Sequence, residues 1–145
     1  VVVGFSLIFQ FYLPRFRALM QYLRDHGVRC HFTIGGHFPS LSHERTLELI
    51  PEVDSVVRFE GELTLLELVE SLIHARDWHK IDGIAYRQNE SIVANPLRRL
   101  LDDLDLLPFP YRQYEPTTIM GQRTMPILAS RGCSRTCSFC SIHMF

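Results

Sequence analysis

The sequence lacks an excess of charge of either sign, a long apolar run and a secretory leader. Among its 145 residues, 15 are Lys or Arg and 16 are Asp or Glu, which gives a formal net charge of −1. A polycationic nucleic-acid binder, in which bulk charge drives affinity, is therefore excluded. No window approaches the roughly 20 apolar residues of a membrane span. With 46% hydrophobic and 21% charged residues, the composition is globular and excludes a disordered chain.

The two ends of the sequence differ from those of a typical domain. The chain begins at Val1, without Met, inside an apolar run, and it stops at Phe145, shortly after three clustered cysteines. We expect a fragment cut at both ends. The first apolar run has no basic region before it and no small-residue cleavage site after it, so it is not a signal peptide. Without signs of secretion we expect a cytoplasmic protein without disulfides.

Strand and helix patterns alternate in the first half of the sequence. Pro14 opens one helix and Gly27 ends it, because proline suits a first helical turn and glycine a left-handed stop. Strands are predicted over 1–8, 31–34 and 54–59, and a second helix, capped by Ser42, over 42–50. The clearest helix covers 62–74 and carries an apolar stripe of Leu65, Leu68, Val69, Leu72 and Ile73.

Strands that alternate with helices of this length predict βαβ units and a parallel sheet, hence an α/β fold. Ligands of such sheets bind beyond the carboxyl ends of the strands. Three turns lie there: the residues from Ser6 onward, Gly35-Gly36-His37 and Glu60-Gly61-Glu62. These turns are where we expect a ligand.

The second half has a different character. Residues 83–87 and 91–94 flank Gln88-Asn89-Glu90 and predict a hairpin. Leucines at helical spacing then predict a short helical stripe, and a stiff proline-containing connector follows it. A last apolar strand is predicted from Met125 to Ser130, and Arg131-Gly132 turns the chain into the cysteine loop. The stripe consists of Leu97, Leu100, Leu101 and Leu104, and the connector of Leu107-Pro108-Phe109-Pro110.

The strongest signal is the Cys-x3-Cys-x2-Cys spacing of Cys133, Cys137 and Cys140. Three thiolates within eight residues can converge on one point, and iron–sulfur clusters are held by Cys thiolates. Three protein ligands on a four-iron cluster leave one iron open. A structural zinc site, with His143 as the fourth ligand, is the first alternative. Unrelated buried cysteines are the second, and the spacing alone leaves these alternatives open.

The cysteine spacing, with Arg131-Gly132 before the first cysteine and Phe139 before the last, resembles the radical SAM superfamily. The resemblance implies that Cys133, Cys137 and Cys140 hold a [4Fe–4S] cluster at the mouth of a partial TIM-type barrel. It also implies that the open iron binds S-adenosylmethionine and that Phe139 packs near the adenine. Residues 125–130 would then be the first barrel strand, and His143 an ordinary loop residue.

The upstream half resembles the radical SAM subgroup with an N-terminal cobalamin-binding domain. One departure concerns the run Asp-x-His-x-x-Gly, whose His ligates cobalt in many cobalamin domains of this fold; the sequence has no such run. The usual place of that run lies before Val1, and many members of the subgroup lack the His. The matching pieces are Val3–Ser6, Thr33–Pro39, Val53–Glu62, Gly83–Arg87 and Asp103–Pro110.

The resemblance assigns cobalamin contacts to Ser6, Gly35, Gly36 and Gly61. Each has a second reading from the residues alone. The glycine pair suits a turn after a strand, because glycine adopts positive φ, and Ser6 can cap a neighbouring backbone group instead. Cys30 is expected to be a small core residue. His37 is the one histidine beside the glycine pair, and a solvated loop histidine is its simpler reading.

The predicted fold is α/β: a truncated Rossmann-like cobalamin-binding domain, then the first strand and cluster loop of a partial TIM-type radical SAM barrel. We expect the cobalamin-binding domain over 1–76, a connector with the hairpin over 77–122 and the start of the radical SAM domain over 123–145.

The resemblance implies an enzyme whose cofactors are a [4Fe–4S] cluster, S-adenosylmethionine and cobalamin. It would cleave S-adenosylmethionine reductively to methionine and a 5′-deoxyadenosyl radical, and transfer a methyl group to an unreactive carbon. Its partners would be a small-molecule substrate and an external electron donor of flavodoxin or ferredoxin type. The fragment alone is expected to be inactive. Two alternatives are a rearrangement or ring-forming radical SAM enzyme without methylation, and a corrinoid- or metal-binding module without turnover.

Overall fold

The computed structural model describes residues 1–111, 115–125, 127 and 130–144. It divides into two compact units, Val1–Arg99 and Leu100–Phe145. Among the residues described, no helix has the length and apolar character needed to cross a membrane. The predicted site at the strand ends belongs to the first unit and the predicted cysteine loop to the second.

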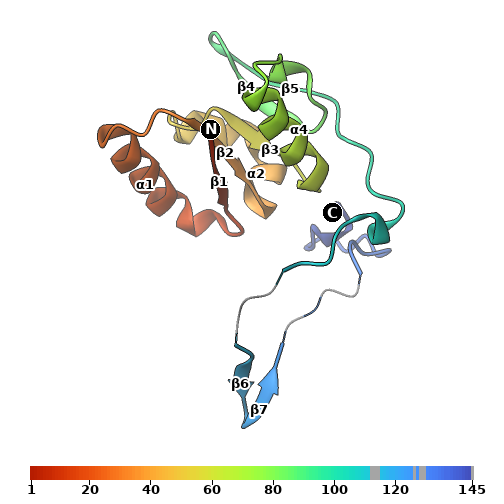
Figure 1. Cartoon of the computed structure of the whole chain (residues 1–145). Helices are drawn as coiled ribbons and strands as arrows, with labels where there is room; N and C mark the ends of the chain where they lie inside the picture. The colour runs from red at the N-terminus through yellow and green to blue at the C-terminus, as the bar shows by residue number, and fades with distance from the viewer. Residues whose placement is uncertain (112–114, 126, 128–129, 145) are drawn as a thin grey trace. The chain divides into compact units, whose positions relative to one another are not determined.

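The first unit is built on a five-stranded sheet of order β1-β2-β3-β4-β5 (Figure 1). The pairs β1–β2 and β2–β3 are parallel, whereas β3–β4 and β4–β5 are antiparallel. The parallel, helix-connected part confirms the predicted α/β class. The strands are β1 (Val2–Ser6), β2 (His31–Gly35), β3 (Ser55–Val57), β4 (Ile84–Gln88) and β5 (Ser91–Ala94).

Four α-helices belong to this unit. The helices α1 (Leu13–Asp25), α3 (His43–Leu49) and α4 (Glu62–Ile73) follow the predicted pattern, while α2 (His37–Leu41) replaces part of a predicted turn. Pro14 sits in the first turn of α1. The helix ends at Asp25, Gly27 follows it with φ at 87°, and the Val28 N–H donates to the Leu23 carbonyl at 3.0 Å. This αL ending is the glycine stop that the sequence predicts.

The core lies on both faces of the sheet. Successive strand residues point to opposite faces, so Val56 packs with Met20 of α1 and Leu47 of α3, whereas Val57 packs with Leu68 of α4. Cys30 packs against the first of these clusters, which confirms it as a core residue. The sheet therefore carries α1 and α3 on one face and α4 on the other.

The apolar stripe of α4 is only partly buried. The buried row is Thr64, Leu68 and Ser71, while Leu65 and Ile73 of the predicted stripe are exposed. Thr64 anchors this row: its Oγ1 donates to the Asp82 carbonyl at 3.2 Å and accepts from Arg98 Nε at 2.8 Å. These polar contacts explain why the helix turns a threonine-containing row to the sheet rather than its most apolar one.

The predicted hairpin is present but belongs to the first unit. Its strands β4 and β5 join by the two residues Asn89 and Glu90, with Asn89 at φ 56°, and β4 pairs with β3. Residues 77–99, which the sequence analysis places in a connector, therefore complete the sheet. The turn residues predict a hairpin from local sequence, but tertiary contacts decide which other strand the hairpin pairs with.

The second unit departs from the sequence expectations. The stripe of Leu97 to Leu104 forms no α-helix; only the short 3-10 turn η3 (Leu104–Leu106) is present. An unpredicted hairpin joins β6 (Thr117–Ile119) to β7 (Gln122–Thr124), with Gly121 at φ 78°. Of the strand expected over 125–130, the residues Met125, Ile127 and Ser130 lie outside any strand, and the others fall outside the described residues.

Candidate functional site

The carboxyl ends of β1, β2 and β3 bring the four predicted cofactor residues together. Ser6 is the register partner of Gly35, and the Leu7 N–H donates to the Gly35 carbonyl at 2.8 Å. A Cβ on Gly35 would lie 3.2 Å from the Val57 carbonyl oxygen, and a Cβ on Gly61 would lie 3.3 Å from Val57 Cγ1. Ser6, Gly35, Gly36 and Gly61 thus meet at one edge of the sheet.

Gly36 is required by the fold itself. Its φ is 102°, which favours glycine, and a Cβ there would lie 2.5 Å from the backbone oxygen of Leu7. The close approach that the sequence suggests is therefore an approach to the neighbouring strand. This backbone contact explains the glycine without a ligand, so Gly36 carries less functional information than the sequence indicates.

An aromatic shelf follows the end of β1. We use this name for Phe9, Phe11 and Tyr12, which lie in and beside the 3-10 turn η1 (Gln10–Tyr12) and are all exposed. The rings of Phe9 and Phe11 stack at 5.4 Å between centroids, and those of Phe11 and Tyr12 lie 4.4 Å apart. Three exposed aromatic rings at a ligand-binding edge provide an apolar platform for a large ring system.

Ser40 connects the ends of β2 and β3. Its hydroxyl donates to the Gly36 carbonyl at 2.8 Å and accepts from the Phe59 N–H at 2.8 Å. Phe59 has φ 59°, a left-handed conformation that is rare for a bulky residue. Such backbone strain gathers at functional sites. Sequence reasoning missed Ser40 because it lies within the unpredicted helix α2.

Arg58 follows β3 directly and is only 8% exposed. Its Nη2 donates to the Asn95 carbonyl, while its Nε is buried and has no hydrogen-bond partner among the described residues. Burial lowers the pKa of the guanidinium. Nearby, the Nδ1 atom of His43 is also buried without a partner in the described part of the chain. Burial and then the charge of Arg58 lower the pKa of His43.

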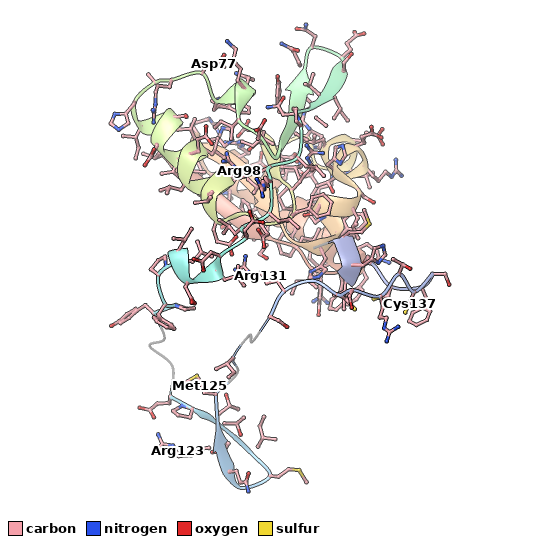
Figure 2. The ribbon with its side chains drawn as sticks, turned by 90° about the vertical axis from the view of Figure 1, so that its right-hand side faces the viewer. Asp77, Arg98, Arg123, Met125, Arg131 and Cys137 are labelled. Carbon is pink, nitrogen blue, oxygen red and sulfur yellow. The ribbon has the colours of Figure 1, made fainter. Side chains whose placement is uncertain are left out.

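The cysteine loop carries its thiols at the surface. Cys137, labelled in Figure 2, is exposed, as is Cys133. Cys140 is partly buried, and Phe139 is 91% exposed. The Arg135 N–H donates to Cys133 Sγ at 3.4 Å, and the Cys140 N–H donates to the Cys137 carbonyl at 3.1 Å. Within residues 1–111, 115–125, 127 and 130–144, no three Cys, His, Asp or Glu side chains are grouped to hold a metal ion. The donor atoms suit an iron–sulfur cluster in kind, but the loop as it stands does not converge them.

Comparison with known protein families identifies the first unit more closely. The B12 binding domain family matches residues 1–69. These residues contain β1 to β3, α1 to α3 and the carboxyl edge with its glycine turns. The matched segment therefore contains every residue predicted to contact cobalamin.

Two curated relatives show how the chain compares with longer proteins. An uncharacterized methyltransferase of Pyrococcus horikoshii is 35% identical over 111 residues, which are 74% of this chain and 24% of the relative. An anaerobic magnesium-protoporphyrin IX monomethyl ester cyclase of Synechocystis sp. is 30% identical over 125 residues, 84% of this chain and 25% of the relative. The chain thus spans about a quarter of the length of these relatives.

Two solved structures share the fold. The radical S-adenosylmethionine methyltransferase TsrM from Kitasatospora setae, with cobalamin and a [4Fe–4S] cluster bound, aligns with a TM-score of 0.60 at 19% identity, over 86% of this chain and 20% of that one. The cobalamin-dependent S-adenosylmethionine radical enzyme OxsB, with aqua-cobalamin and S-adenosylmethionine bound, aligns at 0.57 and 21% identity, over 68% and 14%. At these identities the likeness concerns the fold alone.

Proposed function

Because residues 1–69 match the B12-binding domain family and the chain belongs with the radical SAM proteins that carry this domain, we propose that the carboxyl edge of β1, β2 and β3 binds cobalamin. The observation that carries the proposal is the meeting of Ser6, Gly35 and Gly61 beside an exposed aromatic shelf at that edge. Open sheets of this kind bind their ligands there. The edge offers both backbone access and apolar area.

The residues present suit the parts of a cobalamin. Gly35 and Gly61 carry no side chain of their own, although Val57 lies within 3.3 Å of where a Cβ would stand at either one, and we propose that a nucleotide tail passes the strand ends on the side that these glycines leave free of a side chain. The hydroxyl of Ser6 is exposed at the end of β1 and can donate to the tail or accept from it. The aromatic shelf can pack against the corrin ring and exclude water from that side. A bound cobalamin would supply a cobalt centre that carries a methyl group.

For the complete protein we propose radical SAM chemistry. Cys133, Cys137 and Cys140 would ligate a [4Fe–4S] cluster, and Phe139 would pack against the adenine of S-adenosylmethionine. With an external electron donor, of flavodoxin or ferredoxin type, these cofactors together supply reductive cleavage of S-adenosylmethionine and methyl transfer to a small-molecule substrate. The task of the chain's own loop is to bring three thiolates together, a rearrangement that the exposed thiols leave room for. We place this reaction in the cytoplasm.

A ring-forming reaction is the second candidate. It is favoured by the relative in Synechocystis sp., a cyclase, at 30% identity. Both candidates use the same cofactors, so the cofactor residues named above serve either. A corrinoid-binding module without turnover is the remaining possibility, and a product assay separates it from the two enzymes.

Two measurements test the proposal. Titration with hydroxocobalamin, followed by absorbance, should show saturable binding, and a chain that binds no cobalamin removes the methyl-transfer proposal. After anaerobic reconstitution, Cys133→Ala, Cys137→Ala and Cys140→Ala should each abolish release of 5′-deoxyadenosine by the complete protein. Cys30→Ala, a core cysteine, is the matched control and should retain it. Stoichiometric zinc without iron uptake would contradict the cluster assignment.

A further inference from the structure

We infer that Arg58, with His43 beside it, forms a binding site for a phosphate group at the carboxyl end of β3. Where the phosphate is the phosphodiester in the nucleotide loop of cobalamin, the inference rests on the proposed function. A free phosphate is the other source of the same chemistry. The test below separates the two sources.

The first observation is an arginine with too few acceptors. A guanidinium has five N–H donors and stays charged in proteins. Arg58 is 8% exposed, and among the described residues the one hydrogen bond of its side chain is from Nη2 to the Asn95 carbonyl. Its Nε is buried and makes no bond to the described residues. A buried cation in this condition is costly unless a partner arrives.

Arg87 shows what a structural arginine looks like in the same sheet. It lies on β4, where its Nη1 donates to the Leu47 carbonyl at 2.6 Å and its Nη2 to the carbonyls of Pro51 and Val53. Arg87 therefore joins α3 to the loop before β3 through three acceptors. The side chain of Arg58 has one such acceptor among the described residues, so its contacts within the fold do not explain why an arginine is buried there.

The second observation is the neighbouring histidine. His43 Nδ1 is buried without a partner in the part of the chain that the structure describes. His43 lies three residues after Ser40, whose hydroxyl accepts from the N–H of Phe59, the residue that follows Arg58. The positive charge of Arg58 also lowers the pKa of His43. An imidazole N–H and a guanidinium fork can both donate to one oxyanion. The buried Nε of Arg58, which has no partner among the described residues, thus points to one class of ligand, an anion, and the imidazole of His43 can supply a second donor.

The position of Arg58 in the fold favours an anion that is part of the ligand proposed to bind at the sheet edge. The Arg58 N–H donates to the Gly83 carbonyl at 2.9 Å, which fixes the residue where β3 ends and β4 begins. Phe59, the next residue, is bonded to Ser40 and through it to Gly36. Arg58 is therefore connected to the predicted cobalamin site by adjacent hydrogen-bonded residues.

A phosphate is the anion that suits this site. The planar guanidinium fork matches two phosphate oxygens. In cobalamin the corrin side chains end in neutral amides, and the nucleotide phosphodiester is the one anionic group. A rotation of the Arg58 side chain has to bring Nε to a phosphate oxygen, and among the described residues the one side-chain hydrogen bond that opposes this rotation is the bond from Nη2 to the Asn95 carbonyl.

The experiment compares cobalamin with cobinamide, a corrinoid that lacks the nucleotide and its phosphate. Affinities are measured by absorbance on the full chain, with Arg58→Gln as the test variant and Arg87→Gln as the matched control. Arg58→Gln should weaken cobalamin binding by about 10-fold to 100-fold, the range of a charged hydrogen bond, and leave cobinamide binding unchanged. Arg87→Gln should lower stability and leave the ratio of the two affinities as it was.

The following outcomes overturn the inference or decide between its two phosphate sources. An equal loss for both corrinoids, or no loss for either, overturns it and leaves Arg58 as a water-bonded structural residue. If the chain binds neither corrinoid, the proposed function fails, and inorganic phosphate decides: a rise in the thermal midpoint that Arg58→Gln abolishes supports a free-phosphate site, whereas no rise overturns it. If Arg58→Gln fails to fold, Arg58→Lys keeps the charge without the fork and should weaken cobalamin binding alone.

Discussion

The two edges of the parallel sheet are built differently. At the amino edge, Arg24 donates to the carbonyls of Val28, Cys30 and Glu52 and to the Asp54 carboxylate, and its guanidinium lies 3.6 Å from the centre of the Phe32 ring. At the carboxyl edge, Arg58 has one acceptor and a buried Nε without a partner among the described residues. The hydrogen bonds of Arg24 at the amino edge therefore stabilise the fold, whereas the Arg58 guanidinium at the carboxyl edge keeps hydrogen-bonding capacity that the described residues do not satisfy.

The contrast extends beyond the arginines. At the amino edge, Asp54 Oδ2 also accepts from the Phe32 N–H at 2.7 Å, and His31 is bonded to Ser55 at 2.8 Å. The one buried exception among the described residues there is Glu52 Oε2. At the carboxyl edge the aromatic shelf is exposed and Phe59 is strained. With the proposed cobalamin site at the carboxyl edge, the contacts that stabilise the fold and the proposed ligand site lie at opposite edges of one sheet; open α/β sheets bind their ligands at the carboxyl edge.

The largest expected effect concerns Gly36, which has the closest backbone approach of the three glycines at the carboxyl edge. Gly36→Ala should lower the free energy of unfolding by about 4 kcal/mol, because the new Cβ would meet the backbone of Leu7 at positive φ. Gly27→Ala is the control: Gly27 has φ 87° but open space around it, so the cost should be about 1 kcal/mol. Urea unfolding measures both, and equal costs would show that the contact with Leu7 is not limiting.

Gly61→Ala is the better probe of the site itself. The Cβ would lie 3.3 Å from the side chain of Val57, which can move, so the fold should tolerate it. A fall in cobalamin affinity without a fall in stability would support the site, whereas an unchanged affinity would place the tail elsewhere.

The next effect compares the two arginines directly. Arg24→Ala should lower the free energy of unfolding by about 3 kcal/mol, since it removes four hydrogen bonds and leaves Asp54 without its cation. Arg58→Ala should cost about 1 kcal/mol or less, because it removes one hydrogen bond and an unpaired buried donor. Chemical denaturation of both variants gives the comparison. Similar losses would mean that the carboxyl edge is as structural as the amino edge.

Much of this architecture could be predicted from the sequence, because it depends on local signals. Apolar runs located β1 to β3, Pro14 and Gly27 bounded α1, and the strand ends located Ser6, Gly35 and Gly61. The orphaned nitrogens could not be predicted. Hydrophobic periodicity describes apolar residues, and whether a buried arginine such as Arg58 finds acceptors depends on loops far along the chain, here Asn95.

Two further failures have the same cause. The buried row of α4 is set by the contacts of Thr64 with Asp82 and Arg98, which lie 18 and 34 residues away. The leucines from Leu97 to Leu104 have helical spacing, but Arg98 pairs with Thr64 and Glu67, and the chain forms no helix there before Leu104. In both places tertiary contacts outweigh local propensity.

The smallest effect is on protonation and tests the pairing of Arg58 with His43. Burial first, then the positive charge of Arg58, lower the pKa of His43, while Glu44 and a hydrogen bond with the Ser40 backbone raise it. The neutral form is therefore favoured in the folded state. Stability is fully present above the unfolded pKa of about 6.5 and is lost as the pH falls below it toward the lowered folded pKa. Arg58→Gln removes the repulsive charge, so the pKa of His43 should rise and the loss of stability in acid should shrink.

An NMR titration of the His43 ring in both proteins measures the change in its pKa. Burial lowers the pKa of His31 as well, so His43→Gln identifies the share of the acid sensitivity that is due to His43. An unchanged His43 pKa in Arg58→Gln would show that the two side chains do not interact, and would remove the second donor from the proposed phosphate site.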